Sequence, residues 1–359
     1  QMIEAIGSNL KSTTGAILIL LFVGALAGTW LLSGIIPAMI YYGLQILHPS
    51  IFLPACIVIC AIISIATGSS WTTSATVGIA LIGIGRALEI PVGMVAGAVI
   101  SGAYFGDKLS PLSDTTNLAP AMAGSDLFTH IRYMTHTTIP SIIITIIAFL
   151  ILGFFQNTSG AADTDILLTS IKQSFTINLG LFLVPVLVIF LIIRKTPPLA
   201  ALLAGTLLGG LFALIFQPDL VVKIAGATTL SVTSAYQGVM NAIIGDISVI
   251  TSNELLNDLF SSGGMKGMLG TIWLIVCAMV FGGIMDAIGG LQRLSNALLS
   301  IAQSTFQLFS STAASCVIIN LTASDQYLSI VLPGKMFNKA FADKNLAPED
   351  LSRTLEDAG

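Results

Sequence analysis

A polar stretch at 106–117 concentrates the residue types that bind hard cations and protons. Its two carboxylates are Asp107 and Asp114. Its hydroxyl and amide side chains are Ser110, Ser113, Thr115, Thr116 and Asn117. Carboxylate, hydroxyl and carbonyl oxygens are the ligands that Na+ and other hard cations prefer, and a desolvated carboxylate binds either a proton or a cation. The stretch therefore predicts a site that exchanges the two, with Asp114 and Asn117 as Na+ ligands; the alternative is a solvated loop.

Two further short polar segments, the first tip at 67–76 and the second tip at 322–326, each interrupt an apolar run. The first tip carries no charge, and its candidate ligands for a cation or a carboxylate substrate are Ser69, Ser70, Thr72 and Thr73. The second tip offers Thr322, Ser324 and Asp325 as ion or substrate ligands, with Asp325 as a further Na+ ligand. The alternative for the hydroxyls is hydrogen bonding to helix carbonyls one turn earlier.

Single charged or titratable residues near the first stretch allow more than one role. Lys108 adjoins Asp107 and either neutralises it, meets an organic anion, or extends its ammonium group to the interface. His130 and His136 are expected in a loop after the polar stretch, where a histidine is either a pH sensor or an ordinary surface residue.

The composition identifies the environment of these residues. Hydrophobic residues make up 55% of the 359 residues and charged residues 9%, against about 25% in soluble domains. This excludes a soluble enzyme and a disordered chain, and a net charge of −4 argues against nucleic-acid binding. The apolar runs are long and continuous, so the sequence predicts an all-α polytopic membrane protein in a lipid bilayer.

Two kinds of apolar segment are expected. Runs long enough to cross a bilayer lie at 15–36, 138–155, 178–194, 198–216 and 268–290. Shorter arms flank the polar tips, which predicts re-entrant helical hairpins at 51–87 and 305–341 and a broken helix at 91–122. The flank at 51–66 is expected to be too short to span comfortably.

The sequence contains an internal repeat at a shift of 255 positions. Gly28 aligns with Gly283, Thr67 with Thr322 and Ser69 with Ser324, and the polar tips coincide. Five crossings are expected between the two units, and an odd number inverts the second unit relative to the first. The predicted organisation is a first repeat at 1–135, linking transmembrane helices at 136–236, and an inverted, incomplete repeat at 237–359. The pattern of Pro91 restarts at Pro348, so the chain is expected to be truncated at both ends.

The sequence lacks the motifs that are typical of ATP-driven transport and of several enzyme classes. The sequence has no GxxxxGK[ST] loop for ATP-driven transport, no HExxH and no GxSxG. An intramembrane enzyme and a channel are therefore weaker alternatives than a secondary transporter.

Two long motifs carry a family resemblance. GSSWTTSATVGIALIGIG at 68–85 and SGAYFGDKLSPLSDTTNLAPAMAGSDLFTHIRYM at 101–134 resemble the NhaC-type Na+/H+ antiporter family, and the resemblance extends to SRTLEDAG at the end of the chain. It implies Na+/H+ exchange by alternating access in a bacterial cytoplasmic membrane, without a cofactor, and allows a homodimer. It places five residues at the ion pathway: Asp107, Ser113, Asp114, Thr115 and Asn117. The family includes a malate/lactate exchanger, so Na+- and H+-coupled organic-acid antiport is the alternative.

Overall fold

The computed structural model is almost entirely helical. It describes residues 2–46, 49–111, 113–155, 161–194, 196–251, 256–257, 260–290, 293, 297–298, 300, 302–323 and 326–359. The strands among these residues are β1 (Ile247–Ser248) and β2 (Ser261–Ser262), which pair antiparallel. The prediction of an all-α protein is confirmed apart from this short pair.

Several helices are long and apolar enough to cross a membrane. By length and composition these are Thr13–Leu32, Pro49–Thr67, Leu127–Phe154, Leu199–Phe216 and Gly264–Met285. A sixth candidate is the pair Ile166–Ser174 and Leu179–Ile192, which is bent by 82°. The protein is therefore a multi-pass membrane protein. The expectation that the 51–66 flank is too short is wrong, because the helix runs for 19 residues.

The chain forms two compact units, and each is described by itself. The first unit comprises residues 1–17, 105–141 and 271–359, and the second comprises 18–104 and 142–270. Helices α1 (Met2–Leu32), α6 (Val92–Leu109), α8 (Leu127–Phe154) and α16 (Leu269–Ala287) contribute to both.

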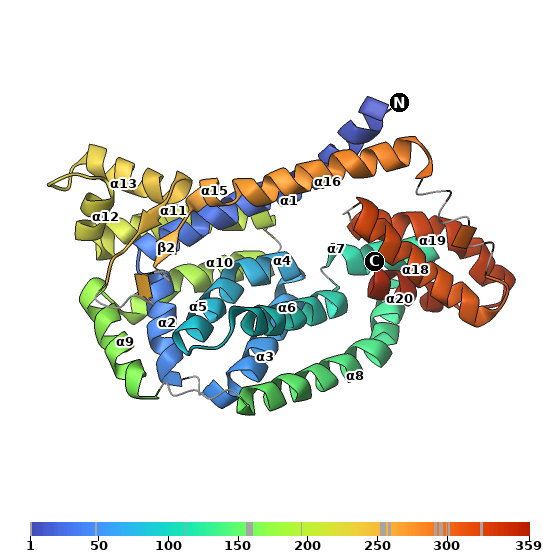
Figure 1. Ribbon diagram of the computed structural model, residues 1–359, viewed down its shortest axis with the longest axis horizontal. Coiled ribbons are helices and arrows are strands. Elements are labelled where there is room, and N and C mark those ends of the chain that lie inside the picture. The colour runs from blue at the N-terminus through green and yellow to red at the C-terminus, as the bar shows by residue number, and fades with distance from the viewer. Residues whose placement is uncertain are drawn as a thin grey trace. The chain divides into compact units, whose positions relative to one another are not determined.

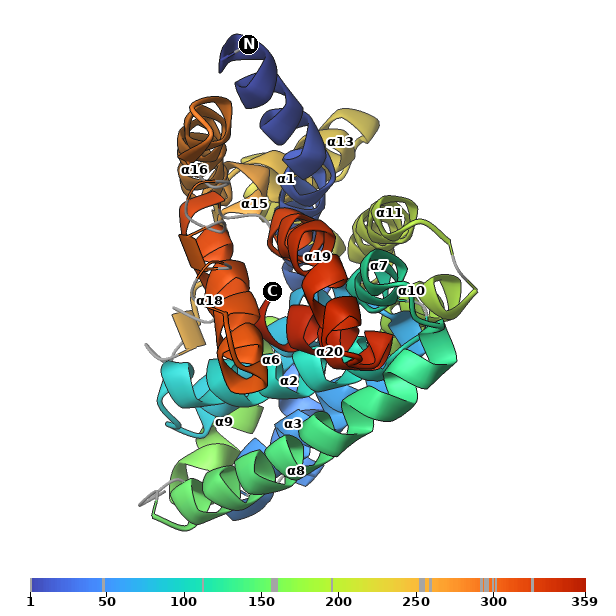
Figure 2. The same cartoon turned by 90° about the vertical axis from the view of Figure 1, so that its right-hand side faces the viewer.

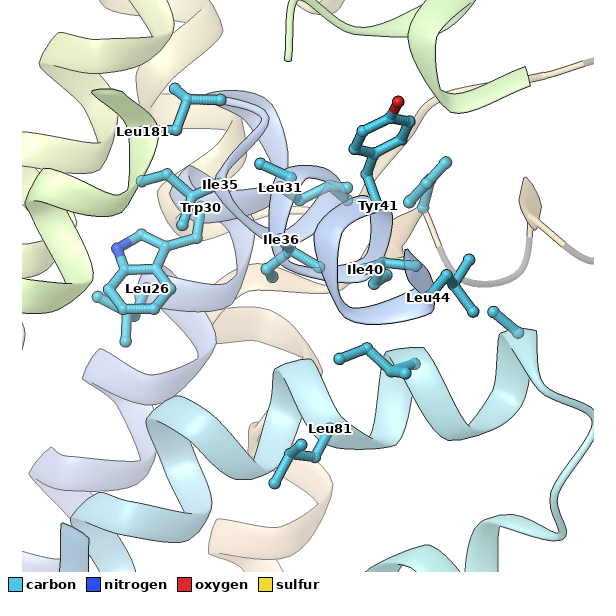
Figure 3. Packing of buried hydrophobic residues seen from close by; sticks show 14 of the residues in the cluster. Leu26, Trp30, Leu31, Ile35, Ile36, Ile40, Tyr41, Leu44, Leu81 and Leu181 are labelled. Carbon is cyan, nitrogen blue, oxygen red and sulfur yellow. The ribbon is translucent and has the colours of Figure 1, made fainter. Parts of the chain in front are cut away.

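The core of the second unit forms where α1 turns into α2 (Ile35–Ile46) (Figure 3). Gly34, at φ +82°, makes this turn in a conformation that favours glycine. Trp30 and Ile35 are buried on either side of the turn, and the indole of Trp30 donates to the Gly205 carbonyl at 3.2 Å. Burial of the indole therefore leaves no unpaired N–H.

The segment predicted as the first hairpin consists of four elements of the second unit. They are α3 (Pro49–Thr67), α4 (Ser70–Thr73), η1 (Ser74–Gly78) and α5 (Ile79–Ala87). Gly68, at φ +68°, ends α3, and Ser69 caps α4 by accepting a hydrogen bond from Thr72 N at 3.1 Å. A Cβ added to Gly85 would lie 3.0 Å from the Phe52 ring, so the far ends of the two arms meet.

The rest of the second unit consists of α9 (Ala161–Ser174), η2 (Leu179–Phe182), α10 (Leu183–Ile193), α11 (Pro198–Phe216), α12 (Pro218–Ile224), α13 (Val232–Ile244), the strand pair and α15 (Gly264–Gly267). Helices α1 and α13 approach so closely that a Cβ on Gly28 would lie 1.8 Å from the Ala242 carbonyl oxygen. Only glycine permits this contact between backbones.

The first unit packs four helices around an apolar cluster. Helix α7 (Asp114–Ala123) contacts α19 (Gln326–Asp343) and α20 (Pro348–Ala358), and Figure 1 shows α7 beside α20. Helix α18 (Thr305–Ala323) runs alongside α20, as Figure 2 shows. The buried cluster includes Ala119, Phe337, Phe341, Leu351 and Leu355. This cluster fixes α20 against the first turn of α7, where the polar stretch lies.

Candidate functional site

The polar stretch is a helix break in the first unit. Helix α6 ends at Leu109 and α7 begins at Asp114. Ser113 caps α7, because its Oγ accepts a hydrogen bond from Thr116 N at 3.4 Å. Asn117 Nδ2 donates to the carbonyls of Pro111 at 2.9 Å and Ser113 at 2.7 Å. The amide group of Asn117 thus joins the first turn of α7 to the residues between α6 and α7.

A glutamate of α20 faces this break. Glu356 is 1% exposed, and its Oε1 accepts hydrogen bonds from Thr115 Oγ1 at 3.0 Å and Thr116 Oγ1 at 3.5 Å. The hydroxyl of Thr116 also lies 3.1 Å from the Asp107 carbonyl oxygen, and the hydroxyls of Ser113 and Thr115 are 3.2 Å apart. Two hydroxyls of α7 therefore reach the buried carboxyl group, and each of them contacts a further oxygen, from Asp107 or Ser113.

The second oxygen of this carboxyl group is unsatisfied. Within the described part of the chain, Glu356 Oε2 is buried and has no hydrogen-bond partner. A buried polar atom without a partner is rare in folded proteins and indicates a ligand, a proton or a functional role. Among the described residues, His130 Nε2, Thr138 Oγ1 and Ser315 Oγ are also buried without a partner, and Glu356 is the one acid in this group.

Lys108 supplies positive charge beside Glu356. Its ammonium group donates to the backbone carbonyl of Glu356 and lies 3.5 Å from the Asp357 carboxylate. Burial raises the pKa of the Glu356 carboxyl to about 7; the Lys108 charge and the Thr115 hydrogen bond lower it, and Asp107 and Asp357 raise it further. Helix α20 lies outside the candidate spans.

The predicted residues of the break contribute in different ways. Ser113 and Thr115 join the oxygen cluster directly, Ser110 is buried, and Asp107 contributes its carbonyl oxygen. Asp114 begins α7, and its side chain lies outside what the structure describes.

The hydroxyls of the first tip bond locally in the second unit. Thr73 Oγ1 donates to the Ser69 carbonyl at 2.9 Å, and Thr72 Oγ1 donates to Ser69 Oγ at 3.0 Å. Ser70 is buried in the same turn. The geometry of Thr73 is the one-turn back-bonding that was the alternative for this tip.

The second tip is described only in part. Thr322 Oγ1 donates to the Ile318 carbonyl at 2.7 Å, again within its own helix. Ser324 and Asp325 lie outside the described residues. The roles of these two residues therefore remain predictions.

Both histidines lie in a helix, so the expectation of a loop is wrong. His130 and His136 belong to α8, and His130 is fully buried. His130 Nδ1 lies 2.8 Å from Ser352 Oγ of α20, and the Tyr133 hydroxyl donates to Asp350 at 2.8 Å. These contacts fasten the face of α20 that carries Glu356 to α8.

The described residues of the break do not form a metal site with several carboxylate ligands. Among the described residues, no three His, Cys, Asp or Glu side chains lie close enough to hold a metal ion together. In the described part of the site, the Glu356 carboxyl group lies among hydroxyl and carbonyl oxygens, which are ligand types that suit a monovalent hard cation or a proton.

Comparison with known proteins identifies the family. The model of the Na+/H+ antiporter family matches residues 102–359, which include both the helix break and α20. The chain belongs to the Na+/H+ antiporter family. This antiporter is 40% identical to the Na+/H+ antiporter NhaC of Alkalihalophilus pseudofirmus, over 99% of the chain and 74% of the relative.

Other relatives of the antiporter carry different substrates in their names. The malate-2H+/Na+-lactate antiporter of Bacillus subtilis is 38% identical over 99% of the chain and 73% of that protein. The arginine/ornithine antiporter ArcD of Halobacterium salinarum is 34% identical over 100% of the chain and 72% of that protein. Proteins whose names specify ion, organic-acid or amino-acid exchange are thus similar to this chain over almost its whole length.

Sequence reasoning missed Glu356, although a signal was present. Leu351 and Leu355 are four residues apart, as are Ser352 and Glu356, and all four are buried. This spacing places a glutamate on the apolar face of an amphipathic helix, where a charged side chain needs a partner or a function.

Proposed function

We propose that this protein is a secondary active transporter that exchanges Na+ for H+ across the bacterial cytoplasmic membrane by alternating access. The observation that carries the proposal is the oxygen-lined helix break in a multi-pass member of the Na+/H+ antiporter family. A cation or a proton bound there would neutralise negative charge that is otherwise costly to bury.

The proposed binding residues are those of the break and the two tips. The break contributes Asp107, Ser110, Ser113, Asp114, Thr115 and Asn117. The tips contribute Ser69, Ser70, Thr72, Thr73, Thr322, Ser324 and Asp325. Hydroxyls that donate to a helix carbonyl keep lone pairs, so the local bonds of the tips are compatible with a ligand.

Two inverted repeats would supply the alternating movement. Helix α3 (Pro49–Thr67), shifted by 255 positions, falls within one residue of α18 (Thr305–Ala323), and both helices have 19 residues. In each case a polar tip follows directly. These matched bounds support the repeat and the hairpins at 51–87 and 305–341.

Organic-acid exchange coupled to Na+ and H+ is the second candidate. It is favoured by the 38% identity to the malate-2H+/Na+-lactate antiporter and by Lys108, a cation near the break. A carboxylate substrate would find an ammonium group and several hydroxyl donors there.

The test uses the intact protein in proteoliposomes that contain a pH-sensitive dye. External Na+ should make the lumen more alkaline, because Na+ enters as H+ leaves, whereas choline should not. Asp114→Asn should abolish the response, since it removes a carboxylate of the break. A response that appears only after malate or lactate is added would contradict simple Na+/H+ exchange and support the second candidate.

A further inference from the structure

We infer that Glu356 of α20 is the carboxyl group at which the transported cation and the proton compete, with the hydroxyls of Thr115 and Thr116 beside it. The inference rests on the proposed exchange function. It adds to the helix break a residue that lies more than two hundred positions away in the sequence.

One oxygen of the buried Glu356 carboxyl group is available to a ligand. Glu356 is almost fully buried, Oε1 is held by two threonine hydroxyls, and Oε2 has no partner among the described residues. A proton or a hard cation at Oε2 would satisfy it, and the two cannot occupy the same lone pair together. Mutual exclusion at one atom is the minimum requirement for exchange.

Other oxygen atoms that could bind a cation lie close to Glu356. Apart from its own oxygens, Glu356 is close to Thr115 Oγ1 at 3.0 Å and Thr116 Oγ1 at 3.5 Å. Thr116 Oγ1 is in turn 3.1 Å from the Asp107 carbonyl oxygen, which lies beside the helix break. Hydroxyl, carbonyl and carboxylate oxygens in one place are the ligand types of a hard monovalent cation.

Charged side chains also lie around Glu356. The charged groups that act on Glu356 in the described chain are Lys108 and Asp107 from α6 and Asp357 from α20. The ammonium group of Lys108 lies 3.5 Å from the Asp357 carboxylate and also acts on Glu356, so one positive charge is shared between two acids of α20. From α8, the buried His130 bonds Ser352 on the same face of α20, and α7 contributes the threonines. One ammonium group therefore faces two acids of α20, and a mobile cation would balance the second.

The alternative role for Glu356 is purely structural. By accepting hydrogen bonds from the side-chain hydroxyls of the first turn of α7, it would fasten α20 to α7. Glu356→Gln separates the roles, because glutamine keeps an acceptor oxygen in the same place and cannot carry the charge. Glu349→Gln is the matched control on the same helix, since Glu349 bonds Ser125 and is not part of the oxygen cluster.

The experiment measures two fluxes in proteoliposomes of the intact protein. One is Na+-driven H+ movement, and the other is exchange of radioactive Na+ for Na+ at equal concentrations and constant pH. Glu356→Gln should lose both, and Glu356→Asp should retain exchange with a Na+ requirement raised roughly 10–100-fold, as for other weakened metal contacts. Glu349→Gln should match the wild type in both fluxes.

A second measurement needs no variant. An apolar carbodiimide modifies protonated, buried carboxyl groups, and mass spectrometry of the wild-type peptide that contains Glu356 reports the extent of modification. Labelling should fall as Na+ rises at constant pH, and choline should not reproduce the effect. This keeps the inference testable if Glu356→Gln does not fold.

Three results would overturn the inference. Unchanged fluxes in Glu356→Gln would make the role structural. Loss of H+ movement with intact Na+/Na+ exchange would make Glu356 a proton carrier without competition, and labelling insensitive to Na+ would exclude cation binding. If instead the wild type moves no H+ in response to Na+, the proposed function fails first, and that failure is visible without any variant.

Discussion

Lys108 Nζ lies 3.5 Å from the carboxylate of Asp357, a residue near the opposite end of the sequence. The same ammonium group donates to the carbonyl of Glu356. One lysine at the end of α6 therefore holds the last turn of α20. Its position next to Asp107 in the sequence suggested a more local role.

Replacing this lysine should loosen α20. Lys108→Gln removes the ion pair with Asp357 and a charged hydrogen bond, and should lower the free energy of unfolding by about 1–2 kcal/mol. Thermal unfolding in detergent measures the change. Lys339→Gln is the control, because Lys339 is exposed on α19 and should leave the unfolding midpoint unchanged. Equal midpoints for the two variants would show that the Lys108 contacts contribute no stability.

The cap of α7 should be measurable in the same way. Ser113→Ala removes the oxygen that accepts from Thr116 N, and caps of this kind stabilise by about 1 kcal/mol. Ser113→Asn keeps a capping oxygen and should recover most of the loss. If the alanine variant unfolds at the wild-type midpoint, the cap is not a stabilising feature.

Close contact between α1 and α13 predicts a strong effect of one methyl group. Gly28→Ala would place a carbon against the Ala242 carbonyl and should destabilise the second unit by about 3 kcal/mol or prevent expression. Gly15→Ala on the same helix meets no described atom within 4 Å and should be neutral or stabilising, by up to ~1 kcal/mol. Similar yields and midpoints for both variants would contradict the contact.

The bond between His130 and Ser352 should appear as coupling. His130→Ala and Ser352→Ala should each destabilise, and the double variant should cost about 1 kcal/mol less than the sum of the two. A double-mutant cycle of unfolding free energies gives this number directly. Strict additivity would mean that the two side chains do not interact.

Burial of Glu356 predicts a specific dependence of stability on pH. Its pKa is raised in the folded protein from the ordinary value of 4.5 to about 7, so the folded state binds the proton more tightly than the unfolded chain. This contribution to the free energy of unfolding is complete below pH 4.5, decreases as pH rises towards 7, and is lost above it. Glu356→Gln should remove this component of the pH profile, whereas Glu349→Gln should retain it. If the Glu356→Gln variant has the same pH profile as the wild type, the assignment is wrong.

Hydropathy and helix breakers were enough to predict the main features of the chain. The long apolar runs at 15–36, 138–155, 198–216 and 268–290 coincide with candidate spanning helices, whereas Pro49–Thr67 was expected to be too short. Ser110 with Pro111 lies where α6 gives way to α7. The bend between α9 and α10 was not predicted, because the 161–174 segment is only weakly apolar and its helix depends on tertiary contacts.

The part of the site on α20 could not be predicted from local pattern. Periodicity shows that Glu356 faces a core, but it does not show which side chains that core contains. The partners Thr115 and Thr116 are set by the packing of α20 on α7, a contact between distant segments. The role of Lys108 could not be predicted for the same reason, because its partner Asp357 is distant in the sequence.

The separation of Thr115 and Glu356 by 241 positions also has a consequence for biosynthesis. At ~5–20 residues per second, the ribosome needs roughly 12–50 s to reach the glutamate after it has made the threonines. During that interval the hydroxyls of the first turn of α7 have no carboxylate to meet and must be hydrated or bonded to other groups. The contacts between the helix break and α20 therefore form late, and the break of a nascent chain would stay hydrated until α20 has been made.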